Sequence, residues 1–431
     1  MSLSLIWKVS SIHTAGRNGW FFLKLLPILF SERGMFLFGV ILGIIAIVLL
    51  LGVSYFLSND KRNINFRAVI IMLGIQFILT WLLLKTTMGL KIVDNISTGF
   101  NKLLEYGMEG VDFVVGGWIP EGQSPFFVNV LLILVFTSAF LSLLTHLKIL
   151  PYIIKFVGGL LSKVTGLPHI ESFNAINSIF FGQADAILAI KTHIKNLNKN
   201  RLFIISTSAM ASVSAALIAS YMTMLPSKFV LIAVVLNVFS ALIVASIVAP
   251  VKVSKEEGEI DINEMIHTKN VFEAIGSGAM DGGKVALIVS VMLIAYLGIL
   301  ALINGIFDSI FGMDLTTMVG YLFSPIAYLM GIPSNEMITA GSVMGTKLIA
   351  NEFAAIMQFQ PMLGELSEKT VSILSTFLIS FASIGSIGIV GGAVQAIDGA
   401  KGKEVSAFGI KMLLVATMAS ILSATIVGLF I

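Results

Sequence analysis

Two long runs of apolar residues limit the structures that this chain can adopt. The stretches MFLFGVILGIIAIVLLLGVSYFL (35–57) and FVLIAVVLNVFSALIVASIVAP (229–250) each exceed the ~20 residues that a helix needs to cross a bilayer. Charged residues make up 12% of the chain, whereas a soluble domain carries roughly 25%. The sequence therefore predicts an all-α polytopic membrane protein that folds as one membrane domain.

Residue types exclude several kinds of chemistry. The chain has no cysteine, which excludes disulfides, thiol catalysis and cysteine-ligated metal. Its histidines form no HExxH or other metal-binding spacing: His13, His146, His169, His193 and His267. Residues 1–34 lack the small-residue cleavage site of a signal peptide. They are either an N-terminal extension at the membrane interface or an over-called start with the initiator at Met35, and the second interpretation is slightly favoured.

Lysine and arginine positions give the expected topology, because cytoplasmic loops collect these residues. Basic residues follow the first span and the third, and the region 90–125 is expected to be an outside loop. Both termini are then predicted to lie outside. About eight spans are expected: 36–57, 68–89, 126–147, 203–223, 229–250, 284–304, 371–397 and 407–431.

The stretch SIFFGQADAILAI (178–190) does not fit a simple span. It is reached from the basic segment 148–163 and it leads into KTHIKNLNKNR, so both ends are cytoplasmic. We therefore predict a re-entrant hairpin over about 171–196, turning at Gly182. Non-helical backbone at membrane depth is tolerated only against protein or a water-filled cavity. Gln183 and Asp185 are accordingly expected to line a cavity.

A second hairpin is predicted over about 334–359, whose flanks are poor in Lys and Arg, as expected for a hairpin that enters from outside. Two spans follow each hairpin, so the order hairpin–span–span occurs twice from opposite faces. Inverted repeats with broken helices are how many secondary transporters build a substrate site at the midplane.

Each predicted hairpin carries one acid, Asp185 in the first and Glu352 in the second. A carboxylate at mid-bilayer costs about 2.5–3.5 kcal/mol on insertion scales. Each acid alone could be a structural partner of a nearby Lys or amide, but two acids at equivalent places favour a function. The stretch 380–393 holds four glycines that weaken the helix, and its Ser383 and Ser386 would share a face.

At these residues the chain resembles the concentrative nucleoside transporter family of bacterial type. The resemblance extends from about Met35 to the C-terminus, and its paired GQ-x-acid and NEF motifs are highly specific. The similar motifs are ESFNAINSIFFGQADA (171–186), ASYMTML (219–225), GTKLIANEF (345–353) and SFASIGSIGIVGGAV (380–394).

The resemblance implies a homotrimer in the bacterial cytoplasmic membrane. Each protomer would have scaffold helices in 35–165, and a core in 166–431 that carries both hairpins and moves as an elevator. It further implies roles for individual residues. Gln183 and Asp185 would bind the nucleobase, and Phe381 would lie beside the nucleoside. Glu352, Ser383 and Ser386 would bind the ribose. The coupling cation, H⁺ or Na⁺, would bind between the hairpin tip and an unwound part of 206–216, near Asn177, Ser178 and Ser212.

The chain departs from the family pattern in two ways. Ala184–Asp185 stands where the family has Ser or Thr followed by Glu, and Ser383 replaces an Asn. The smaller side chains leave more room, which mildly favours purine nucleosides. Apart from a sodium ion, we expect no metal and no cofactor. The expected partners are a nucleoside, the lipid bilayer and further copies of the chain, and no nucleic acid.

Two other functions are weighed against symport. An intramembrane aspartyl protease could use Asp185 and Glu352 as a pair that shares a proton, but acids in opposed hairpins more naturally flank a ligand of nucleoside size. A passive channel is the third alternative, although it would not need the polar pair in each repeat. The sequence thus predicts a transporter and no enzyme.

Overall fold

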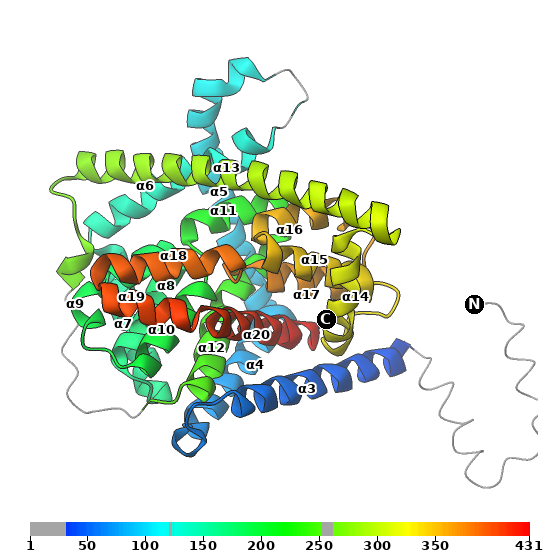
Figure 1. Cartoon of the computed structure of the whole chain (residues 1–431). Helices are drawn as coiled ribbons and strands as arrows, with labels where there is room; N and C mark the ends of the chain where they lie inside the picture. Colours follow the sequence, from blue (N-terminus) through cyan, green and yellow to red (C-terminus); the bar gives the residue numbers. More distant parts are fainter. Residues whose placement is uncertain (1–31, 120–122, 124, 252–261) are drawn as a thin grey trace, which may run out of the picture.

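The structure of the chain is a computed structural model that describes residues 32–119, 123, 125–251 and 262–431 (Figure 1). The predicted N-terminal extension or over-called start falls almost entirely outside these residues. The described residues form α-helices joined by short 3₁₀ and π segments, and they contain no β-strand. The predicted all-α fold class is confirmed.

Seven described helical segments are long and apolar enough to cross a membrane, and each overlaps a predicted span, although α13 extends well beyond the predicted 284–304. They comprise α3 (Glu32–Phe56), α4 (Phe66–Lys85), the π-turn η3 (Phe127–Leu131) with α6 (Ile133–His146), α10 (Lys199–Met210) with α11 (Ala215–Met224), α12 (Ser227–Val248), α13 (Val271–Phe311) and α20 (Gly409–Gly428).

The eighth predicted span, 371–397, is divided into α17 (Glu368–Leu378) and α18 (Ile384–Ile397). The backbone leaves the helix at residues 379–383, ahead of the glycines that were expected to unwind it. Those glycines lie inside α18. A glycine only weakens a helix by about 0.5–1 kcal/mol, so tertiary contacts decide where the chain breaks.

Both hairpins are present and approach from opposite ends of the molecule (Figure 1). The first is α8 (His169–Leu188), which is broken at Gly182, followed by α9 (Lys191–Ile194). The second is α15 (Met337–Ile349) and α16 (Glu352–Phe359), followed by η5 (Gln360–Met362). Gly182 has φ 78°, a left-handed conformation that favours glycine. The predicted turn is therefore found at this residue.

Each hairpin is followed by an interrupted helix, and the two interruptions touch. The first separates α10 from α11 at residues 211–214, and the second separates α17 from α18. The Phe381 amide in one break donates a hydrogen bond of 3.0 Å to the Ser212 carbonyl in the other. The inverted repeat is thus joined at its centre, and α18 lies against the first hairpin.

The region 90–125, which was expected to be a loop, is mostly helix, and this prediction was wrong. It contains α5 (Thr87–Val115), which begins directly after α4, and η2 (Gly116–Trp118). The Thr86 hydroxyl accepts a hydrogen bond of 2.9 Å from the Gly89 amide and so caps α5. In Figure 1, α5 runs across the direction of α13 and its end projects beyond α13.

The remaining helices connect the spans: η1 (Lys61–Asn63), α7 (Ile149–Thr165), η4 (Ile262–Met265), α14 (Leu315–Leu329) and α19 (Gly399–Ala407). Helix α13 has 41 residues and is about 60 Å long, roughly twice the hydrocarbon core. It packs closely on α6, since a Cβ at Gly282 would lie 2.2 Å from the Leu134 carbonyl oxygen. Small residues allow such close approach in membranes.

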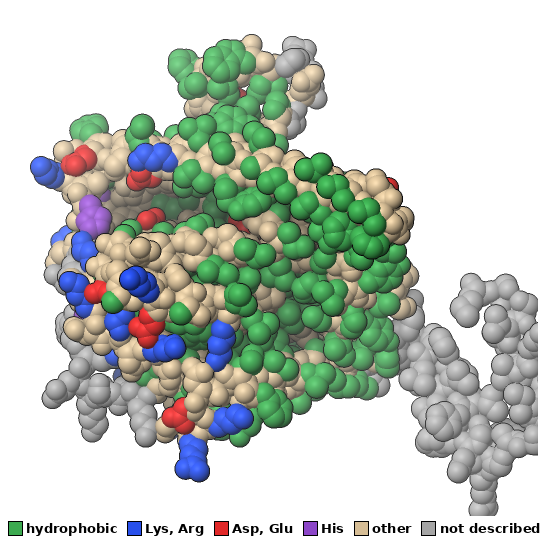
Figure 2. All heavy atoms as spheres, viewed as in Figure 1, with side chains coloured by type: hydrophobic (Ala, Val, Ile, Leu, Met, Phe, Trp, Pro, Cys, Tyr) green, Lys and Arg blue, Asp and Glu red, His purple; other side chains and the backbone are tan. Residues whose placement is uncertain are grey.

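Buried apolar side chains form two main clusters. One joins the first hairpin to α10, α12 and α20, and the other joins the second hairpin to α11, α12 and α17. On the surface, hydrophobic side chains cover much of the face drawn in Figure 2, whereas Lys and Arg gather at the end where α9 and α19 lie. The start of α3 and the end of α20 lie at the opposite end.

Candidate substrate and cation site

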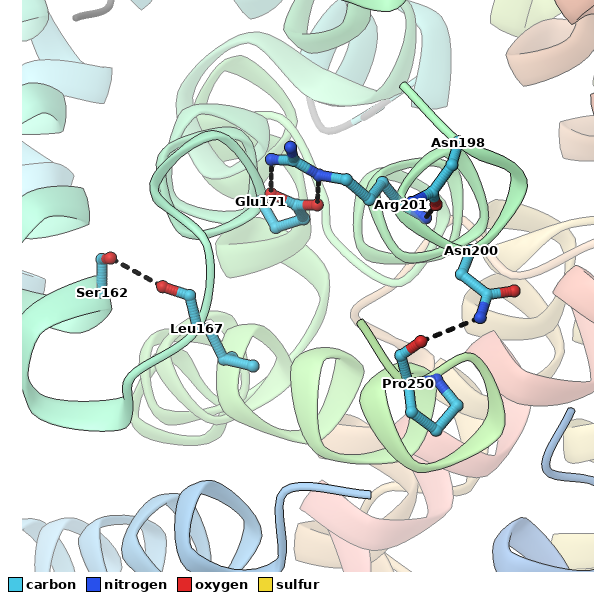
Figure 3. A network of polar contacts seen from close by, with 7 residues as sticks. All are labelled: Ser162, Leu167, Glu171, Asn198, Asn200, Arg201 and Pro250. Atoms are coloured by element: carbon cyan, nitrogen blue, oxygen red, sulfur yellow. Dashed lines mark hydrogen bonds and ion pairs between the residues drawn. The ribbon is translucent and has the colours of Figure 1, made fainter. Parts of the chain in front are cut away.

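The base of the first hairpin is fixed to the helix that follows it (Figure 3). Glu171, in the first turn of α8, is almost fully buried and accepts two hydrogen bonds from the Arg201 guanidinium of α10, one of them 2.7 Å long. A bidentate pair of this kind is both strong and geometrically specific. Asn198 caps α10 by accepting from the Arg201 amide at 3.0 Å. The hairpin tip is therefore presented from a fixed base.

The tip of this hairpin brings Gln183 against the second repeat. A Cβ at Gly182 would lie 3.2 Å from the Ser214 Cβ and 3.6 Å from Phe381, so both the α10–α11 break and the α17–α18 break pack closely on the turn. The Gln183 side-chain amide donates a hydrogen bond of 3.3 Å to the Ser386 hydroxyl. Its carbonyl oxygen is buried and has no partner among the described residues. Gln183 thus has a free acceptor for a ligand.

Ser383 and Ser386 lie together at the start of α18, as their spacing predicts. Their hydroxyl oxygens are 3.4 Å apart and share a hydrogen bond, and the Ser386 hydroxyl also donates to the Phe381 carbonyl. Both serines are buried. The structure therefore joins four predicted site residues into one group: Gln183, Phe381, Ser383 and Ser386.

Asp185 lies one turn beyond the tip and is exposed. The described residues make no hydrogen bond to its carboxylate, and its main electrostatic neighbour is Asp281 of α13. Figure 2 shows this face hollowed beneath α13, with acidic side chains inside the hollow. Asp281 is itself paired with Lys284 at 3.0 Å, whereas Asp185 has no such partner among the described residues. Like charges repel, and a ligand that donates hydrogen bonds to Asp185 would offset this repulsion.

Glu352 is the first residue of α16, at the tip of the second hairpin, and is buried. Its carboxylate accepts a hydrogen bond of 3.0 Å from the Tyr221 hydroxyl of α11. The neighbouring Phe353 packs on Tyr221 with ring centroids 5.0 Å apart. Among the described residues, no hydrogen bond joins Glu352 to Ser383 or Ser386. The structure thus gives Glu352 a different set of partners from the serines.

Lys347 is a buried charged residue to which the sequence analysis gave no role. It is fully buried on α15 and donates hydrogen bonds to the Ser380 hydroxyl, at 2.7 Å, and to the Phe377 carbonyl. It also interacts electrostatically with Glu352. The available signal was a lysine inside GTKLIANEF, a stretch predicted to lie at membrane depth, where a charge requires a partner.

The three residues expected near a cation also lie together. The Ser212 hydroxyl donates to the Ser178 carbonyl at 3.2 Å and to the Ala209 carbonyl at 2.8 Å. The side-chain oxygen of Asn177 is buried and has no partner among the described residues. These oxygens suit a hard cation, which takes oxygen ligands. The donor set is therefore compatible with an alkali cation.

Comparison with known proteins covers most of the chain. Three family models match successive segments: "Na+ dependent nucleoside transporter N-terminus" over residues 45–118, "Nucleoside recognition" over 127–228, and "Na+ dependent nucleoside transporter C-terminus" over 229–428. The chain is 34% identical to the uncharacterized transporter YutK of Bacillus subtilis, over 91% of this chain and 100% of that protein.

Two relatives carry names that describe a substrate. The purine nucleoside transport protein NupG of Bacillus subtilis is 31% identical, over 91% of this chain and 99% of its own. The nucleoside permease NupC of Helicobacter pylori is 32% identical, over 92% of this chain and 99% of its own.

Solved structures of a protein named CNTnw match the fold in several states. An inward-facing, substrate-bound structure has a TM-score of 0.85 and 31% identity, covering 92% of this chain and 98% of that one. An outward-facing structure of a variant has a TM-score of 0.86 and 30% identity, covering 91% and 98%. Inward-facing and outward-facing states of one fold are those of an alternating-access transporter, and an elevator-type transporter works in this way.

The protease alternative is set aside, because these matches are to transporters. With its opposed hairpins, its two touching helix breaks and its match along most of its length, the chain belongs to the concentrative nucleoside transporter family.

Proposed function

We propose that this protein imports nucleosides across the bacterial cytoplasmic membrane by symport with a cation, H⁺ or Na⁺. The observation that carries the proposal is the hydrogen bond of 3.3 Å from the Gln183 side-chain amide to the Ser386 hydroxyl, because these residues belong to opposite repeats. A midplane site between inverted repeats is where transporters of this architecture bind their substrate.

The polar groups support recognition of both ends of a nucleoside. The free oxygen of Gln183 and the exposed carboxylate of Asp185 are acceptors for the N–H groups of a base. Ser383 and Ser386 offer hydroxyls, and Glu352 offers a carboxylate, for the ribose hydroxyls. The Phe381 ring supplies an apolar surface against the tip. A site that hydrogen-bonds a substrate in this way rejects analogues that leave its groups unpaired.

The oxygens around Asn177, Ser178 and Ser212 are the proposed ligands of the coupling cation. They join the first hairpin to the break between α10 and α11. A cation bound there would hold the hairpin tip against the break, and so would couple ion binding to the position of Gln183. This linkage is the physical basis of the proposed symport.

Purine nucleosides are the favoured substrates. Ala184 and Asp185 are smaller than the family's Ser or Thr and Glu, and Ser383 is smaller than Asn. The extra room suits a bicyclic base. The name of the similar protein NupG, a purine nucleoside transport protein, supports the same preference.

We also propose that the protein is a homotrimer, with residues 35–165 contributing scaffold helices and 166–431 the moving core. The long helix α13 supports further contacts, since it exposes a row of large apolar residues such as Leu287, Val291 and Ile294. Helix α5 projects beyond α13. Phe113 near its end and Trp118 in the following η2 are both exposed. Chemical crosslinking in native membranes tests this proposal, and crosslinked products up to the trimer are expected. Products no larger than the dimer would contradict it.

The decisive experiment is uptake of radiolabelled adenosine, guanosine, uridine and cytidine into proteoliposomes that contain the purified chain. Imposed sodium and proton gradients are applied separately. We expect accumulation against a concentration gradient with one of the two ions, and faster uptake of the purine nucleosides. Equilibration without accumulation under both gradients would indicate a passive pathway and would contradict symport.

A further inference from the structure

The two repeats can be aligned residue by residue at their tips. Gln183 and Glu352 each begin the second arm of a hairpin and are 169 positions apart. The same interval relates Ser178 to Lys347 and Asn177 to Thr346. Lys347 thus occupies, in the second repeat, the position that a proposed cation ligand occupies in the first.

The helix breaks align as well. Helix α10 ends at Met210 and α17 at Leu378, which are 168 positions apart. The same interval relates Ser212 to Ser380, and Ala209 to Phe377. The alignment therefore pairs the three residues of the proposed cation site, Asn177, Ser178 and Ser212, with Thr346, Lys347 and Ser380.

The contacts at these paired positions correspond. In the first repeat the Ser212 hydroxyl binds the carbonyls of Ser178 and Ala209. In the second repeat the Lys347 ammonium binds the Ser380 hydroxyl and the Phe377 carbonyl.

The unpaired atoms correspond too. The side-chain oxygens of Asn177 and Thr346 are both buried and both lack a partner among the described residues. Equivalent oxygens therefore lie in both repeats, and in the second repeat the Lys347 ammonium binds two of them, those of Ser380 and Phe377.

We propose that Lys347 is a tethered cation, which takes in the second repeat the place that the free coupling cation takes in the first. The inference rests on the proposed symport and deepens it: one repeat needs an ion from solution, and the other carries its own. The protein would then move one cation with each nucleoside.

The chemistry of the lysine fits this role. Its ammonium is a compact point charge with three donors, and its acceptors here are oxygens. Lys347 is fully buried, and a buried charge is retained only when it is paired. Glu352 supplies the opposite charge on the same hairpin. Lys347 thus holds the second hairpin to its break with a charge of the chain's own, whereas in the first repeat an ion from solution would add to the hydrogen bond between Ser212 and Ser178.

The number of charges moved per nucleoside is the first test. Adenosine uptake into proteoliposomes is measured at membrane potentials clamped with potassium and valinomycin, and the potential at which net flux stops gives the coupling ratio. We expect one charge per nucleoside. Two charges would overturn the tethered cation while leaving symport intact, and no dependence on any cation would overturn the symport itself.

The second test removes the tethered charge. Lys347→Met keeps the apolar stem and deletes the ammonium, and we expect adenosine binding to weaken at least about tenfold. Lys228→Met is the matched control, because Lys228 is partly exposed and its ammonium contacts the exposed Glu368 carboxylate and the Phe229 ring. Binding by a folded Lys347→Met protein within about twofold of the unmodified chain would contradict the proposal.

The third test places a tethered charge in the first repeat and leaves Lys347 in place, so it remains decisive if Lys347→Met fails to fold. Ser178→Lys should bind adenosine without added sodium and at alkaline pH, and its uptake should no longer respond to an ion gradient. Adenosine binding that still requires the coupling cation would show that the two positions are not equivalent, and would overturn the inference.

Discussion

At the scale of single residues, burial separates the two hairpin acids. Glu352 is enclosed with a donor hydroxyl from Tyr221 and the charge of Lys347, whereas Asp185 is exposed and faces Asp281. Removing one partner of a buried ion pair strongly destabilises the protein, because the remaining buried charge has no counter-charge. The two acids should therefore respond differently to neutral replacements.

We expect Glu352→Gln to abolish nucleoside uptake, because it removes the carboxylate that balances Lys347 and that is proposed to bind ribose. Uptake of labelled adenosine at matched expression measures the loss, which should exceed about 100-fold for a pair worth ~3–5 kcal/mol. Glu368→Gln makes the same chemical change at an exposed acid and should keep normal uptake. Near-normal uptake by Glu352→Gln would rule out the ribose-binding role.

Base selectivity should depend on the two residues after Gln183. The double change Ala184→Ser and Asp185→Glu restores the family pattern and narrows the site, so we expect preference to move toward pyrimidine nucleosides. Each mismatched hydrogen bond is worth about 1–3 kcal/mol, and the ratio of uridine to guanosine uptake should rise roughly tenfold. Equal losses for all nucleosides would instead assign these residues to hairpin support.

Single residues of the site could be predicted from sequence, but their contacts could not. Gln183 and Asp185 are polar residues in an apolar stretch of sequence, and this alone indicates a function for them. The contact of Gln183 with Ser386 depends on how two segments 203 positions apart pack. Lys347 was missed for the same reason, since its partner Phe377 lies in the last turn of α17 and its partner Ser380 lies in the following break, whose place the sequence does not reveal.

At the scale of elements, apolar length identifies spans but not amphipathic helices. Helix α5 has a polar residue in nearly every turn, so apolar length alone predicts a loop there. The break before α18 was expected among its glycines, yet it lies at residues 379–383, where Phe381 bonds to Ser212. Contacts between the repeats therefore fix the breaks more than local composition does.

The hairpin turn offers a test at this scale. At Gly182 the φ of 78° is unfavourable for any residue with a Cβ, and the neighbouring Ser214 Cβ would be 3.2 Å away. We expect Gly182→Ala to cost about 1–2 kcal/mol and to displace Gln183. Thermal unfolding in detergent should show a lowered midpoint, together with weakened adenosine binding.

Gly74→Ala is the matched control for this change. Gly74 lies inside α4 with open space around its Cα, and alanine favours a helix interior. Its unfolding midpoint should stay the same or rise. An unchanged midpoint and normal binding in Gly182→Ala would mean that the turn tolerates a side chain, and that its geometry does not position Gln183.

At the scale of the whole molecule, the distribution of basic residues fits the arrangement of the two hairpins. Lys and Arg gather at the end that carries α9 and α19, and the two hairpins enter from opposite ends (Figures 1 and 2). The positive-inside rule predicts that the end with the first hairpin is cytoplasmic. The beginning of α3 and the end of α20 would then both be outside, as the sequence predicts.

Labelling of single cysteines tests this orientation, and the background is clean because the chain has no native cysteine. Lys195 follows α9 at the first hairpin, Glu365 precedes α17 at the second, and both are exposed. In intact cells a membrane-impermeant maleimide should label Glu365→Cys, and should label Lys195→Cys only after permeabilisation. If both positions react from the same side, the hairpins do not enter from opposite faces. If the two sides are exchanged, the inverted repeat stands but the protein is oriented the other way, and the positive-inside assignment is wrong.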